Sequence, residues 1–359
     1  MKKVIIVNTV GLVYDGITNI MMSYIKTMDK NGMDIYIVST IKAEPGIVEQ
    51  LKKNGCHIID LPSRQKNTLS YFYGLAKFIR KNKIDIIHAH GNSGTLAIEM
   101  IAGWLGGCTK RIAHSHNTKC NRVKADKLLR PFFYLFYTDA VACGEEAGHW
   151  PFKNRQFTVL KNGRNIDEFS YNAEIREKIR RKLKIENEIV IGHVGGFYEQ
   201  KNHKFLMRIF RSMIEIEPNV RLLLVGEGPL KSEIKNSSRD IDDKVLFLGT
   251  TDYVADYLQA MDGMLLPSLF EGLPLVAIEW QINGLPCLLA DTITKDCGLM
   301  QNVKFISLDA SPKIWALEIL NLIRNNNRLR YSEMASHIIK RAGFDIKQNA
   351  KQLREMYIS

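Results

Sequence analysis

The sequence predicts an α/β protein made of two doubly wound parallel sheets in tandem. Short apolar runs of β type alternate with amphipathic helical stretches along the chain. Two such series are separated by a charge-rich, strand-poor stretch, and 359 residues exceed the size of one ordinary core. The hydrophobic content of 45% and the charged content of 25% are typical of a soluble globular protein. We therefore expect two Rossmann-like domains with a cleft between them.

The first series occupies the N-terminal half of the chain. Val4–Val7 is an expected strand, and a stripe of apolar residues from Ile17 to Met28 predicts a helix that stops at Gly32. Further strands are expected at Ile35–Val38, Ile84–Ala89, Arg111–Ser115 and Ala140–Cys143. We assign this series to a first domain of residues 1–165.

The second series begins near residue 189. Its expected strands are Ile189–Val194, Leu222–Val225, Val245–Leu248, Met264–Leu266 and Cys287–Ala290. The charge-rich stretch 173–188 precedes them and is expected to be a helix just after the interdomain connection. We assign residues 166–340 to the second domain. The helical pattern of Ile346–Ile358 lies in residues 341–359, a C-terminal helix expected to pack back on the first domain.

Composition excludes several classes of protein. No apolar stretch approaches the roughly 20 residues that a membrane helix needs, and the apolar part of the N-terminus is too short for a secretory signal. The cysteines, at positions 56, 108, 120, 143, 287 and 297, form no C-x-x-C pair. This pattern favours a reducing cytoplasm over a disulfide framework or a zinc site. We expect a cytoplasmic protein.

The formal charge of +12 has three candidate explanations: nucleic acid, an anionic membrane surface and phosphorylated substrates. Lysine and arginine are widely spread and no nucleic-acid-binding motif is present, so we expect no nucleic acid. The segment Lys119–Tyr137 combines basic residues with clustered aromatic residues, as a membrane interface does. A solvated basic loop before a buried helix explains it equally well.

The stretch Pro267–Glu279 is the most informative part of the chain. An apolar run leads into it, a glycine turn follows, and an apparent helix starts at Pro274. A strand that ends in a turn and opens a helix binds anions, because free backbone N–H groups and the helix dipole point at the ligand. Glu271 and Glu279 suit a ligand that also carries hydroxyl groups. Phosphate and hydroxyl groups together indicate a nucleotide sugar more readily than a free nucleotide.

A second motif opens the first strand–loop–helix of the second domain. Gly195 and Gly196 let the backbone approach a ligand closely. Lys201 then comes at the N-terminus of an amphipathic helix, where the dipole disfavours a cation. A lysine there indicates a bound anion, most simply a diphosphate. The alternative is an exposed surface lysine.

The order of these motifs resembles the C-terminal half of the family-4 retaining glycosyltransferases, which have the GT-B fold. The resemblance rests on Gly-Gly…Lys201, Leu-Val-Gly-Glu-Gly-Pro-Leu, Phe-Leu-Gly, Pro-Ser…Glu271-Gly…Glu279 and Gly284-Leu285-Pro286. The first half, at Ala113–Thr118 and Ala142–Gly148, is similar to bacterial capsule and exopolysaccharide members. Nearly the whole chain is covered.

The resemblance implies a role for each matching position of the second domain, which would bind the nucleotide sugar. Lys201 would hold the donor diphosphate, Glu279 would accept hydrogen bonds from the ribose, and Glu271 would face the transferred sugar as a catalytic residue. The other implied donor contacts are Gly195, Gly196, Gly249, Thr250 and the backbone N–H groups of Gly272, Leu273, Leu275 and Val276.

The first domain would bind the acceptor. Gly11 and Gly16 flank the loop after the first strand, where the family has a glycine-containing loop near the phosphate and acceptor. His116 matches the active-site histidine of the family. His114, two residues earlier, points to the same side of its strand.

His88 and His90 also lie two residues apart at a strand end. They are either a metal-binding pair or polar residues at a cleft rim. No Cys, Asp or Glu completes a ligand set nearby in the sequence, and the family needs no divalent metal. We expect no metal and no cofactor.

The chain departs from the family at Gly196, where relatives commonly carry an arginine five residues before the lysine. One cation for the diphosphate is therefore missing. The consequence is weaker donor binding, a substitute cation such as Arg111 or Arg164, or a protein that no longer transfers sugar. Because Lys201, Glu271 and Glu279 remain, we favour weaker or compensated binding.

These features lead to an expected function. The chain would move a hexosyl or N-acetylhexosaminyl group from a nucleotide sugar, UDP-linked in most family members, to a growing glycan. The expected acceptor is a polyprenyl-diphosphate-linked saccharide at the inner face of the cell membrane, for a capsule or exopolysaccharide. Two alternatives are a nucleotide-sugar epimerase on the same fold and a non-catalytic GT-B subunit of another transferase.

Overall fold

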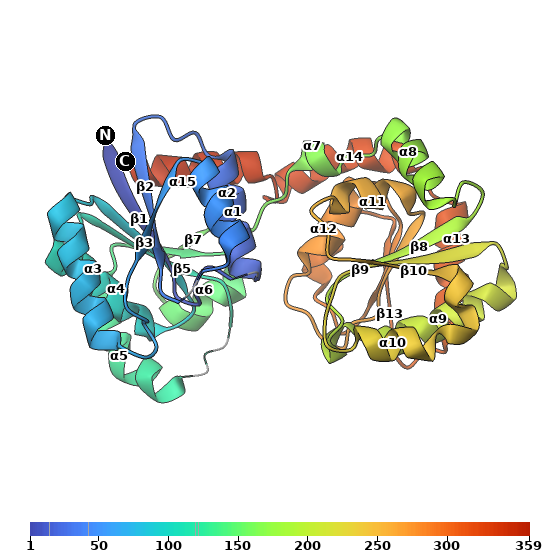
Figure 1. Cartoon of the computed structure of the whole chain (residues 1–359), viewed down its shortest axis with the longest axis horizontal. Helices are drawn as coiled ribbons and strands as arrows, with labels where there is room; N and C mark the ends of the chain where they lie inside the picture. Colours follow the sequence, from blue (N-terminus) through green and yellow to red (C-terminus); the bar gives the residue numbers. More distant parts are fainter. Residues whose placement is uncertain (14, 42, 119, 121) are drawn as a thin grey trace. The chain divides into compact units, whose positions relative to one another are not determined.

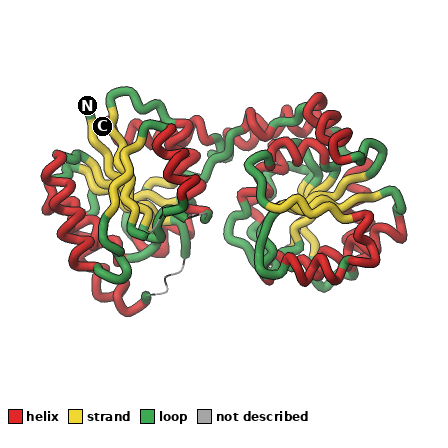
Figure 2. Tube along the Cα trace, viewed as in Figure 1, coloured by secondary structure: helices red, strands yellow, loops and turns green. Residues whose placement is uncertain are grey.

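The computed structural model describes residues 1–359 except 14, 42, 119 and 121. The chain divides into two compact units (Figure 1). The first unit comprises Met1–Gly163 and Ile346–Ser359, and the second comprises Arg164–Asp345. In each unit a parallel sheet lies between helices (Figure 2).

The first unit contains a seven-stranded sheet in the order β3-β2-β1-β4-β5-β6-β7. Its strands are β1 (Lys2–Asn8), β2 (Met33–Ser39), β3 (Cys56–Asp60), β4 (Ile86–Gly91), β5 (Lys110–Ser115), β6 (Asp139–Ala142) and β7 (Thr158–Val159). Its helices are α1 (Gly16–Thr27), α2 (Pro45–Lys53), α3 (Thr68–Asn82), η1 (Gly94–Leu96), α4 (Ala97–Gly106), α5 (Val123–Phe136), α6 (Glu145–Phe152) and α15 (Ile346–Ile358). All pairings are parallel, and the strand order reverses between β1 and β4.

The second unit contains a six-stranded sheet in the order β10-β9-β8-β11-β12-β13. Its strands are β8 (Ile189–Val194), β9 (Val220–Val225), β10 (Val245–Gly249), β11 (Gly263–Leu266), β12 (Cys287–Ala290) and β13 (Val303–Ile306). Its helices are α7 (Ile166–Phe169), α8 (Ala173–Leu183), η2 (Glu199–Lys201), α9 (His203–Ile216), α10 (Lys231–Ser237), η3 (Arg239–Lys244), α11 (Val254–Ala260), α12 (Leu275–Ile282), η4 (Lys295–Cys297), α13 (Pro312–Arg324) and α14 (Arg328–Arg341). The pairings are again all parallel, and the order reverses between β8 and β11.

The ten expected strands are present in this fold, with small differences at their ends. The sequence analysis missed β3, β7 and β13. The central strands are buried on both faces and read as apolar runs, whereas β3 and β13 are edge strands with exposed residues such as His57 and Lys304. The helix expected from Pro274 begins one residue later, and Pro274 is its N-cap.

Two helices expected from the sequence are present in the fold. The charge-rich stretch forms α8. Arg176 and Arg180 of this helix both bind Asp262 at the start of β11, and these ion pairs hold α8 against the sheet. Helix α15 packs against α1 and β1 of the first unit, beside which Figure 1 shows it. Its Tyr357 is fully buried there. Among the described residues, every helix is too short or too polar to span a bilayer.

Candidate functional site

The strand order of the second unit reverses between β8 and β11. Open parallel sheets bind ligands where the strand order reverses, because the connections on the two sides leave in opposite directions. The loop after β8 carries Gly195 and Gly196 and leads through η2 into α9. The loop after β11 carries Glu271 and leads into α12. Both predicted motifs therefore meet at this point.

Lys201 and Glu271 form an ion pair that joins these two loops. The Lys201 Nζ lies 2.6 Å from Oε1 of Glu271, to which the Ser268 hydroxyl also donates at 2.8 Å. The other carboxylate oxygen, Oε2, accepts from the Gln200 side-chain amide at 3.0 Å. The Lys201 side chain is only 17% exposed, so the interpretation as a surface lysine is wrong. Lys201, which is expected to bind the donor phosphate, and Glu271, which is expected to face the transferred sugar, are thus direct neighbours.

Glycine turns bring the neighbouring loops to the same edge. A Cβ atom at Gly226, after β9, would lie 2.1 Å from the carbonyl oxygen of Gly195. The Gly226 N–H also donates to the carbonyl of Gly249 at 2.9 Å. Gly226 and Gly249 have φ values of +145° and +73°, which glycine adopts readily. Gly249 and the adjoining Thr250 therefore lie at the same edge as Gly195.

Glu279 lies in α12 and is paired with a cation. Its Oε1 accepts from Nε of Arg164 at 2.6 Å. Burial raises the pKa of Glu279, Arg164 opposes that rise, and Glu168 adds to it. Arg164, one of the two candidate substitute cations, thus already neutralises a carboxylate. Arg111, the other, lies at the amino end of β5 and donates to backbone carbonyls.

The start of α12 supplies backbone donors. Leu275 and Val276 are its first two residues, whose N–H groups have no partner within a helix. Gly272 and Leu273 precede them in the loop, and Pro274 between them has no N–H to donate. Orphan N–H groups together with the helix dipole favour an anion.

In the first unit, the strand order reverses between β1 and β4, where the loop after β1 carries Gly11 and β4 carries His88 and His90. Gly11 has a φ of +91°, and a Cβ atom there would lie 2.4 Å from Cγ1 of Ile41. Helix α1 begins at Gly16, and the Asp15 side chain caps it by accepting from the Thr18 N–H at 2.7 Å. The loop after β1 therefore holds a capped helix N-terminus at the carboxyl edge of the sheet.

Four histidines form one cluster: two in β4, one in β5 and one directly after β5. His88 Nε2 lies 3.1 Å from His114 Nδ1, and His90 Nδ1 lies 2.8 Å from His116 Nε2. The Tyr357 hydroxyl lies 2.6 Å from His88 Nδ1. His88 and His90 are 0% and 2% exposed, so the expectation of polar residues at a cleft rim is wrong.

Burial keeps these imidazoles neutral. It lowers the pKa of His88 to about 3 and that of His116 to about 4, and it holds the pKa values of His90 and His114 well below the usual range. The ligand atoms of His88, His90 and His114 lie within 4.8 Å of one another, which is near enough for a metal ion to be considered. However, ring nitrogens in the cluster already bond to each other and to Tyr357. The rings of His88 and His114 are stacked at 9° instead of converging on a point. We therefore describe a hydrogen-bonded stack, and the absence of a metal stays a prediction.

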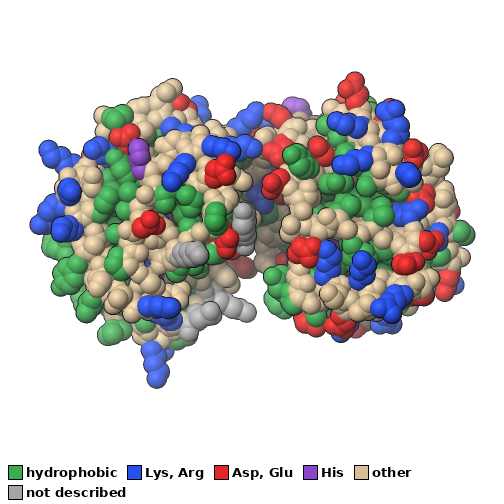
Figure 3. All heavy atoms as spheres, in the orientation of Figure 1, with side chains coloured by type: hydrophobic (Ala, Val, Ile, Leu, Met, Phe, Trp, Pro, Cys, Tyr) green, Lys and Arg blue, Asp and Glu red, His purple; other side chains and the backbone are tan. Residues whose placement is uncertain are grey.

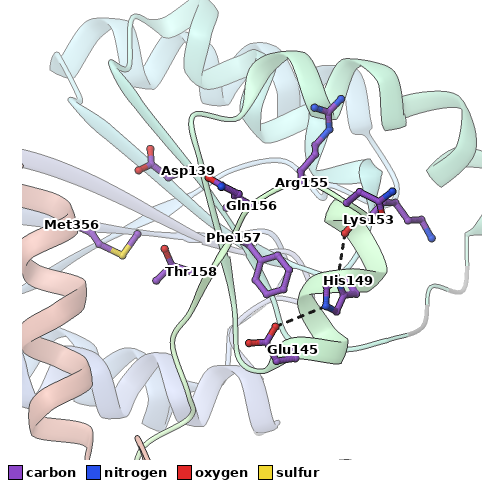
Figure 4. Close-up of a pocket in the computed structure, with 11 residues that line it drawn as sticks. Asp139, Glu145, His149, Lys153, Arg155, Gln156, Phe157, Thr158 and Met356 are labelled. Carbon is purple, nitrogen blue, oxygen red and sulfur yellow. Dashed lines mark hydrogen bonds and ion pairs between the residues drawn. The ribbon is translucent and has the colours of Figure 1, made fainter.

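A separate hollow of about 560 Å³ lies elsewhere on the first unit (Figure 4). It is lined by the start of β6, by α6, by the connection to β7 and by Met356 of α15. In Figure 4 Glu145 and His149 are joined by a contact of 3.9 Å on one helix face. None of the predicted site residues lines this hollow.

Sequence reasoning missed several residues at these sites. Gln200 and Ser268 hold Glu271, and Tyr357 bonds to His88 from a helix 269 positions away. His193 is buried beneath Gly195. His193 alone carried a visible signal, because it is a histidine inside an otherwise apolar strand and lies two residues before Gly195.

Known proteins resemble the chain in both halves. The family described as "Glycosyl transferases group 1" matches residues 188–325, and the family described as "Glycosyl transferase 4-like" matches residues 10–140. The EpsF protein of Bacillus subtilis, named as a glycosyltransferase, is 31% identical over 97% of this chain and 94% of its own length.

Two further proteins are similar to this chain. An Escherichia coli enzyme is named UDP-Gal:alpha-D-GlcNAc-diphosphoundecaprenol alpha-1,3-galactosyltransferase and is 26% identical over 84% of this chain and 81% of its own length. The crystal structure of Anabaena HepE in complex with UDP superposes with a TM-score of 0.77 at 16% identity and covers 99% of both chains.

Lys201→Ala should weaken UDP binding roughly 10- to 100-fold, because a charge-assisted contact contributes about 1.5–3 kcal/mol. The variant also leaves Glu271 without its cation beside an incoming anion. The double variant Lys201→Ala/Glu271→Ala should therefore bind UDP more tightly than the single one. Titration calorimetry measures both. Wild-type affinity in Lys201→Ala would remove this lysine from the binding site.

Gly196→Arg should tighten UDP binding by about 1 kcal/mol, because it adds a cation beside the loop after β8. Gly196 is not among the positive-φ glycines, so its backbone accepts a side chain. A Cβ there would lie 2.6 Å from the ring of Tyr198, which is 57% exposed and has to turn aside, and 3.3 Å from the carbonyl oxygen of Glu227. UDP affinity and thermal stability are measured together. A stable variant with no gain in affinity would show that another group already supplies the charge.

Proposed function

This chain belongs to the family-4 glycosyltransferases of the GT-B fold, and we propose that it transfers a hexosyl or N-acetylhexosaminyl group with retention of configuration from a UDP-sugar to a lipid-linked glycan. The observation that carries the proposal is the Lys201–Glu271 pair at the strand reversal of the second unit, beside the N-terminus of α12. The Anabaena relative crystallised with UDP supports a UDP-linked donor. The Escherichia coli relative, whose name includes diphosphoundecaprenol, supports a polyprenyl-linked acceptor, as capsule or exopolysaccharide assembly uses.

The proposed donor chemistry is stabilisation of the leaving diphosphate. Lys201 and the first N–H groups of α12 place positive charge where the diphosphate charge develops, and no metal is needed for it. Both carboxylate oxygens of Glu271 already accept hydrogen bonds. Glu271 is therefore better suited to orienting the sugar than to forming a covalent intermediate. Front-side attack by the acceptor hydroxyl follows as the route to retention.

The proposed acceptor chemistry uses the histidine stack. Nε2 of His114 and Nδ1 of His116 are buried and have no hydrogen-bond partner among the described residues. A neutral imidazole with a free lone pair can accept the proton of an attacking hydroxyl. We assign that role to His116, with His114 behind it. Their partners His90 and His88 fix the ring positions.

The proposed location is the inner face of the cell membrane. Helix α5 exposes Leu128, Phe132 and Leu135 by 73%, 49% and 72%, and their spacing puts them on one stripe. Lys124 extends that stripe by one turn and Lys127 lies beside it, whereas Lys119 lies outside the described residues. Exposed apolar side chains flanked by lysines suit an anionic lipid surface. On the face that Figure 3 shows, basic and acidic side chains are otherwise interspersed, unlike the basic stripe of a nucleic-acid-binding protein.

Product analysis tests the function directly. The protein is incubated with a panel of UDP-sugars and a polyprenyl-diphosphate-linked monosaccharide, and the anomeric configuration of the product is read by NMR. A disaccharide lipid with the donor's configuration supports the proposal. An altered UDP-sugar without acceptor would indicate an epimerase, and UDP binding without any turnover would indicate a non-catalytic subunit.

Glu279→Gln and Glu271→Gln should have different effects. Glu279→Gln should weaken UDP binding on the order of tenfold, because a carboxylate–hydroxyl contact to the ribose is lost. Glu271→Gln should lower turnover while UDP affinity stays level or rises, since Lys201 is released from its partner. Calorimetry and turnover rates separate the two. Equal losses of UDP affinity in both variants would refute this division of roles.

The protein should sediment with anionic vesicles and not with neutral ones. Lys124→Glu/Lys127→Glu should release it, and so should high salt, because such attraction is screened within about 10 Å at 0.1 M. Lys52→Glu/Lys53→Glu on α2 is the matched charge control and should still bind. Equal binding to neutral and anionic lipid would contradict an electrostatic contact.

A further inference from the structure

His193 is a buried histidine of β8 to which the proposed chemistry gives no task. Building on the proposed donor site, we propose that His193 takes up a proton when the nucleoside diphosphate binds and supplies the second positive charge that Gly196 cannot. The proton comes from solvent and goes to the Nε2 atom, and no covalent bond of the ligand changes.

The hydrogen bonds of His193 leave one nitrogen unused. Nδ1 lies 2.9 Å from the backbone carbonyl of Leu265 on the adjacent strand β11. A carbonyl oxygen only accepts, so Nδ1 carries the ring proton. Nε2 is then a bare lone pair, and it has no partner although the residue is 0% exposed. Buried polar atoms are nearly always bonded, so an unpartnered nitrogen next to a binding loop points to a ligand.

The position of Gly195 shows which part of the binding loop Nε2 of His193 faces. A Cβ atom at Gly195 would lie 3.2 Å from Nε2 of His193 and 3.2 Å from Cε of Lys201. The side of this glycine that a Cβ atom would occupy is therefore bordered by the imidazole and by the lysine side chain. An anion seated against Gly195 would lie within reach of both. The absent side chain thus lets two potential donors come close to the same point of the backbone.

The surroundings explain why His193 is neutral in the structure. Burial lowers its pKa well below the usual range, and His203 and Lys201 lower it further. His203 of α9 lies 4.7 Å away between ring centroids, and Lys201 of η2 is paired with Glu271. The neighbouring strand segments, Leu222–Val225 and Met264–Leu266, carry only apolar side chains. No carboxylate of these elements competes for the proton.

A bound diphosphate reverses this balance. Its negative charge favours the imidazolium, whereas the lone pair of the neutral ring would repel a phosphate oxygen. The pKa of His193 is then higher in the complex than in the free protein. Binding takes up a proton, and UDP affinity falls as the pH rises through the pKa of the complex.

The test counts protons by calorimetry. UDP is titrated at about pH 7.5 in two buffers of different ionisation enthalpy, and the difference gives the protons taken up per UDP. The wild-type protein should take up roughly 0.5–1 proton. His193→Gln keeps a polar side chain but cannot be protonated, so it should take up none and bind on the order of tenfold more weakly. His337→Gln, on the exposed side of α14, is the matched control and should behave as wild type.

A second measurement tests the inference even if His193→Gln fails to fold. ¹⁵N NMR of the histidine rings in the wild-type protein should show Nε2 of one buried histidine becoming protonated on UDP addition. His193→Gln/Gly196→Arg should regain affinity without proton uptake. If the wild-type protein binds UDP normally without taking up a proton, the inference about His193 is overturned and the proposed function is not. The same holds if His193→Gln takes up as many protons as the wild type. Failure of the wild-type protein to bind any nucleoside diphosphate would overturn the proposed function instead.

Discussion

Parallel pairing of every strand is the constraint on which the rest of this structure depends. In each unit it directs all strand carboxyl ends to one edge and all amino ends to the other. The strand order reverses once in each sheet, at β1/β4 and at β8/β11. Each reversal separates two loops that leave in opposite directions. In the second unit these loops carry Lys201 and Glu271, and in the first unit the loop after β1 carries Gly11 next to the histidines of β4.

Charge balance is the second constraint on the proposed donor site. The two predicted glutamates each hold a cation, Glu271 with Lys201 and Glu279 with Arg164, and all four side chains are largely buried. A buried charge is tolerated only when it is paired. The charges of these four side chains therefore balance one another without a ligand. A ligand that carries extra negative charge upsets this balance. The site then needs either an additional cation or a group that can become one.

The features that could be predicted from the sequence are those that depend on a local pattern of residues. The buried strands read as apolar runs, and the glycine turns and the two glutamates could be placed at strand ends, because a parallel sheet constrains each of these features locally. The contacts that complete the sites could not be predicted. The pairing of Lys201 with Glu271 spans 70 positions, and that of Tyr357 with His88 spans 269. The packing of His90 against His114 depends on strand register, which alternation alone does not determine.

The division of the chain has a consequence for how the protein is made. The first unit is discontinuous: its sheet forms from Met1–Gly163, but α15, which packs on α1 and β1, lies beyond the whole second unit. Domains emerge from the ribosome in order, so the early strands must wait until Arg164–Asp345 has been synthesised before their last covering helix arrives. Until then the histidine stack lacks Tyr357 and α1 lacks its neighbour. The first unit is thus begun first and finished last, and it reaches its final form only after the second unit has been made in the same molecule.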